Sequence, residues 1–277
     1  MNKDVELDVD LVSQGLDSLQ ATMIRNKLTS GLKLLNKNVN ISSTVVFQYP
    51  KITLLSNYIE DVIKGNQISL SEDDKIKIKL TEIDNMIQRQ VSKLKTKPSD
   101  GWIPPKVEGQ LVLVTGTTGG LGAQLLVTLL NDPLVKKVYA VNRPNPSKSL
   151  KDRQIKSFEE KHISKDLIDS TKIELIEADL NSDNNLSLSD EIYSDIKNNV
   201  DVIIHNAWRV DFNVALQSFE SDLNGLVNLT NLAITSKYGA ALIFTSSIGS
   251  LARWPIGKPT VEEPLSDSSI AIGMGYG

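Results

Sequence analysis

The hydrophobic positions near the beginning of the chain recur with the period of an amphipathic helix. Apolar side chains stand at Leu16, Leu19, Met23, Ile24 and Leu28, and this spacing predicts a helix that starts near residue 16. We expect Leu16 and Leu19 to anchor the first turn of this helix in a small bundle.

Two further short helices are predicted before residue 65. Ser43 or Thr44 is a suitable N-cap for the first of them. Pro50 blocks a helix that runs into it, so the second is expected to start near Lys51 or Ile52 and to end at Gly65.

The pattern between about residues 66 and 106 is charged and only partly periodic. It predicts a long exposed helix near 72–95, followed by KPSDGWIPPK, which breaks regular structure with three prolines and a glycine. We therefore expect three segments: a small helical domain over 1–65, a linker over 66–106, and a larger domain over 107–277.

From Glu108 onward, apolar runs rich in β-branched residues alternate with helical stretches. The runs are QLVLVT, KKVYAVNR, KIELIEADL, VDVIIHNA and GAALIFTSS. Apolar strands that alternate with helices indicate a parallel sheet covered on both faces. The predicted fold class is α/β, a Rossmann-like doubly wound parallel sheet, preceded by the small all-α bundle.

The first of these runs leads into a glycine-rich turn, VTGTTGGLG, with the spacing G-x-x-G-x-x-G. Such a turn lets the backbone approach a pyrophosphate, and the helix that follows presents free N–H groups to the phosphates. We predict a dinucleotide site, the alternative being a purely structural turn. The residues expected to line the site are Thr115, Gly116, Thr118, Gly119, Gly120, Leu121 and Gly122.

The second run ends without the carboxylate that would bind an adenosine ribose. Asn142 and Arg143 stand there instead, and a guanidinium suits a 2′-phosphate, which favours NADPH over NADH. Arg153 is either a second contact to this phosphate or a solvated surface charge. Asp179 and Leu180, at the end of the third run, are expected to flank the adenine.

The fourth and fifth runs end in residues that are expected to face the reactive part of the cofactor. Asn206 and Ala207 end the fourth run, and we expect both to lie against the cofactor. His205 is interpreted as a structural histidine rather than an acid or base. The hydroxyls of Ser246 and Ser247, at the end of the fifth run, are placed where a nicotinamide would lie.

Composition narrows the chemistry further. The net charge of −4 argues against nucleic acid as the main partner, and the absence of cysteine excludes disulfides, thiolate metal sites and a cysteine nucleophile. Only two histidines are present, so we expect no metal site. The sequence shows neither a secretion signal nor an apolar run of the roughly 18 residues that a membrane helix needs, which indicates a cytoplasmic protein.

Taken in order, VTGTTGGLG, ADL, HNAW, SDLNGLVNL, FTSS and GYG resemble an extended short-chain dehydrogenase/reductase. More narrowly, they resemble the thioester reductase domains of adenylate-forming reductases related to nonribosomal peptide synthetases, such as the fungal carboxylic acid and aminoadipate reductases. The resemblance implies a catalytic Ser/Thr, Tyr and Lys. The hydroxyl falls on Ser247, with Ser246 as its rival, and the tyrosine falls on Tyr276. The lysine would lie three positions beyond Gly277, so this chain is expected to be truncated and to reduce little or nothing.

The stretch QGLDSLQ, in turn, resembles the attachment motif of acyl and peptidyl carrier proteins. The resemblance implies that a phosphopantetheinyl transferase adds 4′-phosphopantetheine to Ser18; the alternative is that Ser18 is only an N-cap. Few residues precede Ser18, so we expect most of the first carrier helix to be missing.

Together the two resemblances imply reductive release of an acyl thioester, carried on the arm at Ser18, as an aldehyde, with a second reduction to an alcohol left open. The implied partners are an adenylation domain and a phosphopantetheinyl transferase, with no nucleic acid or membrane. Two rivals remain: a free-standing reductase or epimerase that acts on a soluble small molecule, and a docking unit that does no chemistry.

Overall fold

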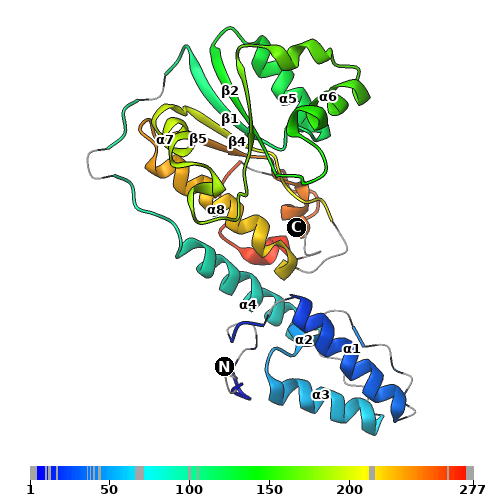
Figure 1. Cartoon of the computed structure of the whole chain (residues 1–277). Coiled ribbons are helices and arrows are strands. Elements are labelled where there is room, and N and C mark those ends of the chain that lie inside the picture. Colours follow the sequence, from blue (N-terminus) through cyan, green and yellow to red (C-terminus); the bar gives the residue numbers. More distant parts are fainter. Residues whose placement is uncertain are drawn as a thin grey trace. The chain divides into compact units, whose positions relative to one another are not determined.

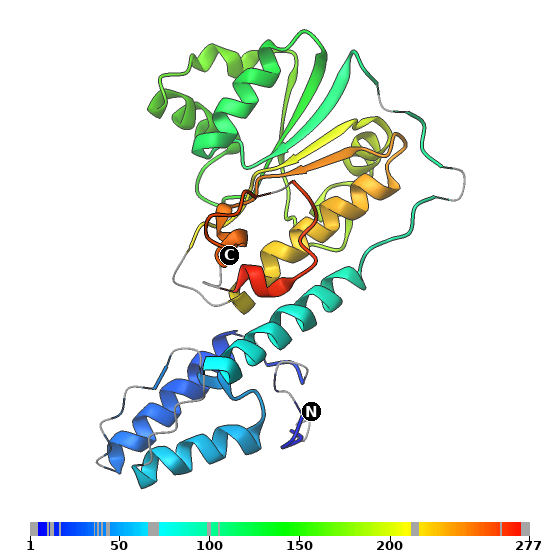
Figure 2. The same ribbon diagram turned by 180° about the vertical axis from the view of Figure 1, so that it is seen from behind.

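The computed structural model describes most of the chain. The residues outside the description are 1–4, 10, 12–13, 17, 36, 38, 40, 43–44, 66–71, 99–100, 105, 212–215, 261 and 273–277. The chain forms two compact units (Figures 1 and 2). The first comprises Met1–Met86, Phe212–Ser218 and Ile248–Gly277, and the second comprises Ile87–Asp211 and Phe219–Ser247.

Three helices of the first unit surround a small apolar core. They are α1 (Ser18–Leu34), α2 (Val45–Gln48) and α3 (Ile52–Lys64). The core gathers buried residues from all three helices and from the segments between them: Leu11, Ala21, Leu32, Ile41, Val45, Val46, Phe47, Tyr49 and Leu55. The predictions of a helix that starts near Ile52 and ends at Gly65 are confirmed. The predicted caps of α2, Ser43 and Thr44, lie outside the described residues.

The buried face of α1 differs from the one predicted. Ala21 and Leu32 are buried and Ile24 packs against the core, whereas Leu19 is 69% and Met23 53% exposed. The prediction that Leu19 anchors the first turn is therefore wrong. An apolar stripe wider than the face that a short bundle covers leaves part of itself in solvent, and in α1 Leu19 and Met23 lie on that part.

The second unit is built on a five-stranded parallel sheet, with strand order β3-β2-β1-β4-β5. The strands are β1 (Gln110–Thr115), β2 (Val135–Asn142), β3 (Ile173–Glu177), β4 (Val202–His205) and β5 (Ala241–Phe244). The main helices between them are α5 (Gly120–Asn131), α6 (Leu150–Glu160), α7 (Asp190–Asn199) and α8 (Glu220–Thr235). Short 3₁₀ turns of this unit lie at Lys165–Asp169 and Asn185–Ser187. The turn Leu216–Phe219 spans the sequence boundary between the units, and the turns Ile248–Leu251 and Ser268–Ala271 belong to the first unit.

Alternate side chains of the strands belong to two separate cores, one on each face of the sheet. In β1, Val112 and Val114 belong to the core that contains residues of α5 and α6, including Leu126 and Phe158. Leu113 of the same strand belongs to the core with residues of α7 and α8. The period of two along a strand thus supplies both faces, and the predicted doubly wound sheet is confirmed.

Helix α4 (Glu72–Val91) begins where the sequence predicts a long helix and ends four residues earlier than expected. Its last residues, from Ile87, belong to the second unit. In the described part of the chain, no helix is both long and apolar enough to cross a membrane. Nor do the described residues include a group of three or more metal-ligating side chains placed to hold an ion.

Candidate functional site

The glycine turn after β1 is packed so closely that two of its positions exclude a side chain. Gly116 has φ +74°, and a Cβ there would lie 3.0 Å from Cα of Ala207. A Cβ on Gly122 would lie 2.8 Å from the carbonyl carbon of Gly116 and 2.9 Å from Nδ2 of Asn206. The turn, the start of α5 and the end of β4 are therefore in direct backbone contact, and the predicted residues Asn206 and Ala207 lie beside the predicted glycines.

The first turn of α5 fits a pyrophosphate. Gly119 occupies the N-cap position and supplies no side-chain cap, so the first amides of the helix are left for another acceptor. Gly120 has only the end of Lys161 near the place of a Cβ, at 4.0 Å, and Leu121 is 53% exposed. This combination of free amides, a helix dipole and small residues suits a dinucleotide.

Thr115, at the end of β1, is fully buried and holds the turn that follows β4. Its Oγ1 accepts hydrogen bonds from the backbone N–H of Asn206 (3.0 Å) and of Ala207 (2.9 Å), and it lies 2.9 Å from Nδ1 of His205. A hydroxyl has two acceptor sites and one proton. Both acceptor sites are used, so the hydroxyl donates to Nδ1 and the imidazole carries its proton on Nε2. From its buried position, Thr115 therefore fixes the backbone of Asn206 and Ala207.

His205 lies in an aromatic cluster, which agrees with its interpretation as a structural residue. The ring centroid is 5.6 Å from that of Phe244 and 6.3 Å from that of Trp208. Burial lowers the pKa of His205 to about 4, so the ring is neutral near pH 7. Its Nε2 has no hydrogen-bond partner among the described residues.

Asn142, which stands where a ribose-binding carboxylate was considered, is turned toward the glycine turn. Its Oδ1 accepts from the backbone N–H and the hydroxyl of Thr118, both at 3.2 Å, and its Nδ2 donates to Oγ1 of Thr117 at 2.7 Å. Gln154 of α6 completes the cluster: its Oε1 accepts from the Thr117 hydroxyl at 2.7 Å, and its Nε2 donates to the Thr117 carbonyl at 3.0 Å. Strand β2, the glycine turn and α6 are thus joined by buried hydrogen bonds.

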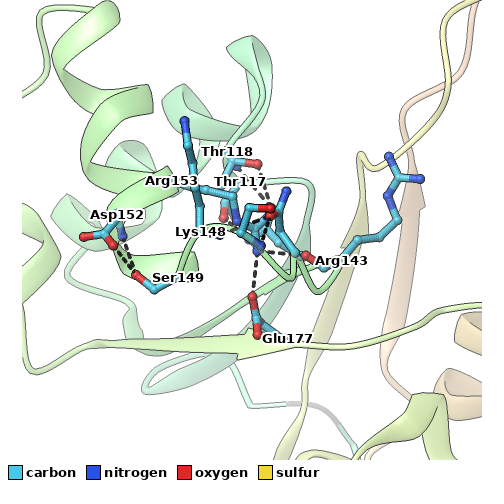
Figure 3. A network of polar contacts seen from close by, with 11 residues as sticks. Thr117, Thr118, Arg143, Lys148, Ser149, Asp152, Arg153 and Glu177 are labelled. Carbon is cyan, nitrogen blue, oxygen red and sulfur yellow. Dashed lines mark hydrogen bonds and ion pairs between the residues drawn. The ribbon is translucent and has the colours of Figure 1, made fainter.

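The two arginines near this cluster have different surroundings (Figure 3). Arg153 donates through Nη2 to Oε1 of Glu177 and to the carbonyl oxygen of Arg143, both at 2.8 Å. Its side chain is only 18% exposed. Arg143 is exposed, and in Figure 3 its side chain points away from Arg153. Of the two, Arg143 is the guanidinium in position to meet an anion from solvent.

The segment after β3 is fixed to α8. Asp179 is exposed and accepts the backbone N–H of Asn181 at 3.0 Å, while Leu180 packs against the core. Asn228 of α8 donates through Nδ2 to the carbonyl of Leu180 at 2.9 Å. The adenine contacts predicted for Asp179 and Leu180 stay predictions, on a loop that the structure holds in place.

The predicted catalytic hydroxyls follow β5. Ser246 is exposed and Ser247 half-buried, at the same sheet edge as Asn206, because β5 pairs in parallel with β4. Tyr276 lies outside the described residues. Ser18 is the first residue of α1, in the other unit.

Three residues of the site were missed from the sequence: Thr117, Gln154 and Asn228. Gln154 carried a recognisable signal, because it lies four residues from both Leu150 and Phe158 on the buried stripe of α6. A polar residue on such a stripe indicates a buried hydrogen-bonding role.

Comparison with known proteins identifies both parts of the chain. A family of NAD-binding domains, described as "Male sterility protein", matches residues 114–269, more than half of the chain. The chain belongs to this family. A second family, described as "Phosphopantetheine attachment site", matches residues 2–59. The predicted cofactor classes, a nicotinamide dinucleotide and phosphopantetheine, are confirmed.

The relatives and a solved structure agree with this assignment. The adenylate-forming reductase Nps11 of Serpula lacrymans is 37% identical over 290 residues, which cover 100% of this chain and 26% of the relative. A carboxylic acid reductase of Neurospora crassa is 31% identical over 99% of this chain and 25% of its own length. The chain thus spans about a quarter of these relatives. The terminal R domain from the myxalamid PKS-NRPS pathway shares the fold, with a TM-score of 0.56 and 23% identity over 69% of this chain and 49% of that domain.

Proposed function

We propose that this chain is the carrier and reductase part of an adenylate-forming reductase, which releases an acyl group from its phosphopantetheine arm as an aldehyde. In the reaction the thioester carbon gains a hydride, the C–S bond breaks, and the sulfur leaves as the free thiol of the arm. NADPH and one proton are consumed, and NADP⁺ is formed.

One observation carries this proposal: a phosphopantetheine attachment site and an NAD-binding reductase domain occur in the same chain. An arm that holds thioesters, joined to a domain that binds a hydride donor, combines substrate and reductant in one protein. A free-standing reductase of soluble molecules has no use for the arm. The whole-length relatives, an adenylate-forming reductase and a carboxylic acid reductase, support an adenylation domain as the partner that activates the acid, and a phosphopantetheinyl transferase would add the arm.

The residues at the carboxyl edge of the sheet have separate parts in this mechanism. The amides at the start of α5, beside Gly119 and Gly122, would hold the pyrophosphate of a bound dinucleotide, whose nicotinamide would supply the hydride. The hydroxyl of Ser247 or Ser246, together with Tyr276, hydrogen-bonds the thioester carbonyl oxygen and stabilises the negative charge that develops on it. Asn206 and Ala207, fixed by Thr115, form the floor of the site.

The preference for NADPH rests on Arg143. A 2′-phosphate gains charge-assisted hydrogen bonds from an exposed guanidinium that NADH cannot use. We expect Arg143→Gln to weaken NADPH binding about tenfold, equivalent to about 1.4 kcal/mol, and to leave NADH binding unchanged. The matched control is Lys136→Gln, which removes the same charge at the exposed opposite end of β2. Equal loss for both nucleotides would contradict the assignment.

The carrier assignment is tested by mass spectrometry after incubation with a phosphopantetheinyl transferase and coenzyme A. We expect the chain to gain one phosphopantetheine group, Ser18→Ala to gain none, and Ser30→Ala, on the same helix, to be modified normally. In the whole protein, Ser18→Ala is expected to abolish aldehyde formation and to keep NADPH binding. A chain that gains no arm would favour the free-standing reductase instead.

A further inference from the structure

The segment that follows α4 is held along the outside of α8. We call residues 92–106, of which the structure describes 92–98, 101–104 and 106, the docked segment. Just before it, Arg89 forms an ion pair with Glu220, the first residue of α8, with Nε–Oε1 3.2 Å. One turn later, Nζ of Lys93 donates to Oδ1 of Asn224 at 2.6 Å. The docked segment therefore begins beside the first turns of α8.

A buried amide in the second half of α8 holds the segment by its backbone. Asn231, only 9% exposed, accepts the N–H of Lys95 through Oδ1 at 2.7 Å and donates through Nδ2 to the carbonyl of Lys93 at 3.0 Å. This double hydrogen bond imitates the pairing of a neighbouring strand. Farther along, Nε1 of Trp102 donates to the carbonyl of Ile234 at 2.8 Å.

The far end of the segment is fixed at the beginning of β4. The N–H of Ile103 donates to the carbonyl of Lys237 at 3.2 Å. Asp201, which is fully buried, accepts the N–H of Lys106 at 3.2 Å and the N–H of Leu111 at 2.9 Å. Its carboxylate also lies 3.5 Å from Nζ of Lys106.

These contacts give the segment a direction with respect to the sheet. The first half of α8 lies near the carboxyl ends of the strands: a Cβ at Gly225 would lie 3.1 Å from Cβ of Leu180, and Asn228 bonds the carbonyl of Leu180, in the loop after β3. Asp201 lies at the amino end of β4. The docked segment thus runs the length of α8, about 24 Å for its 16 residues, from the carboxyl edge of the sheet to the amino edge, where β1 begins.

We infer that the docked segment is a positioning device for the carrier: it makes the chain from the carrier join the reductase unit at the edge that holds the glycine turn and Ser246. This inference rests on the proposed function, in which the carrier delivers a thioester to that edge. Free in solution, residues 93–106 would add up to about 45–50 Å to the tether. The tether would then start at the amino edge of the sheet, away from the glycine turn. Held along α8, these residues leave a shorter tether that starts at the carboxyl edge. The shorter tether raises the effective concentration of the arm at that edge. Asn231 is the main positioning residue.

The test uses the absence of cysteine in this chain, because a single introduced cysteine takes one dye without background. A second dye is loaded on Ser18 as its coenzyme A conjugate by a phosphopantetheinyl transferase. The acceptor is placed at Ser147→Cys, in the exposed loop after β2, or at Lys136→Cys, exposed at the opposite end of β2. Energy transfer is compared with the docked segment intact and after its release by Asn231→Leu.

We expect greater energy transfer to Ser147→Cys than to Lys136→Cys in the native background, and a loss of more than half of that difference in Asn231→Leu. The control Thr230→Val removes a half-buried α8 hydroxyl that bonds the carbonyl of Leu226 in the same helix, and is expected to keep the difference. Trp102→Ala, a change at a partly exposed residue, is a second release variant in case Asn231→Leu folds poorly.

Hydrogen exchange on the same proteins separates docking from positioning. The amide of Lys95 is expected to exchange about tenfold faster in Asn231→Leu, while the amides of β1 keep their protection. A Lys95 amide that is unprotected in the native chain would overturn docking. Faster exchange with unchanged energy transfer would overturn positioning. If Ser18 takes no dye, the proposed carrier function fails, and the exchange result still decides whether the segment is docked.

Discussion

Gly122 offers a sharp test of the glycine turn, because the chain contains its own control two residues away. An alanine at position 122 would place Cβ 2.8 Å from the carbonyl carbon of Gly116 and 2.9 Å from Nδ2 of Asn206. Both distances are shorter than real Cβ contacts, and one neighbour is backbone, which cannot move without shifting the turn. An alanine at Gly120 would meet only the end of the Lys161 side chain, at 4.0 Å.

The comparison of the two variants isolates the steric effect. Both replace glycine by alanine in the first turn of α5, so the helix-propensity gain, up to about 1 kcal/mol, is similar in each. Overpacking costs about 1–3 kcal/mol, and contacts this close place Gly122→Ala at the upper end. We expect Gly122→Ala to be less stable than Gly120→Ala by about 2–3 kcal/mol.

Urea unfolding measures this difference through tryptophan fluorescence, because Trp102 and Trp208 both lie in the second unit. NADPH titration provides a second readout, and Gly122→Ala is expected to bind the nucleotide more weakly than the native chain. Equal stability of the two variants would show that the turn has room for a side chain, and the argument for a close backbone cradle would fail.

Three further predictions follow from buried polar groups at the same edge. Because burial lowers the pKa of His205 to about 4 from 6.5, the unfolded chain takes up a proton between these values before the folded chain does. Stability should therefore fall as pH drops through this window, by up to about 1.4 kcal/mol per pH unit. His205→Asn should flatten the pH dependence of urea denaturation, and a dependence as steep as that of the native chain would contradict this prediction. Thr115→Val leaves two backbone N–H groups unpaired and should lower the free energy of unfolding in urea by about 2 kcal/mol. The matched control is Thr115→Ser, which keeps the hydroxyl. A decrease for Thr115→Val no larger than that for Thr115→Ser would refute the role of this hydroxyl. Asn142→Leu should speed hydrogen exchange at the amide of Thr118 and weaken NADPH binding in a fluorescence titration; unchanged exchange would contradict the hydrogen bonds of Asn142.

The strands and the glycine turn could be predicted from the sequence because local patterns determine them. Buried parallel strands read as continuous apolar runs, and positions such as Gly116 and Gly122 reflect steric demands that only glycine meets. The edge at which Asn206 and Ser246 meet follows from the same logic, since the carboxyl ends of parallel strands lie together. The exposure of Leu19 could not be predicted, because periodicity does not tell how wide a face the neighbouring helices cover.

The contacts made by polar side chains depended on partners far away in the sequence. Asn142 ends a strand, as a ribose-binding carboxylate would, yet its amide bonds Thr118, 24 residues earlier. The docked segment is a stronger case. Prolines and charges predict a linker there, but the partner of its backbone is Asn231, 136 residues beyond Lys95. Composition describes a segment's own preference, and only tertiary structure shows which surface it meets.

Three polar side chains at the carboxyl edge, which we call the polar clamps, hold loops in place by hydrogen bonds. Their contribution to stability alone does not explain why these residues are polar. Thr115, Asn142 and Asn228 each bond the backbone or side chain of a loop that follows a different strand. A typical buried hydrogen bond adds only about 1 kcal/mol net, and well-packed apolar residues can supply as much. An apolar contact is not directional, however, and leaves a loop free to slide, whereas a hydrogen bond fixes its distance and angle. Loops that must present amides and hydroxyls to a bound dinucleotide gain affinity from being held in advance, because less order is lost on binding. The clamps therefore favour this edge as the place of the ligand, and two of them, Thr115 and Asn228, do so independently of the glycine turn.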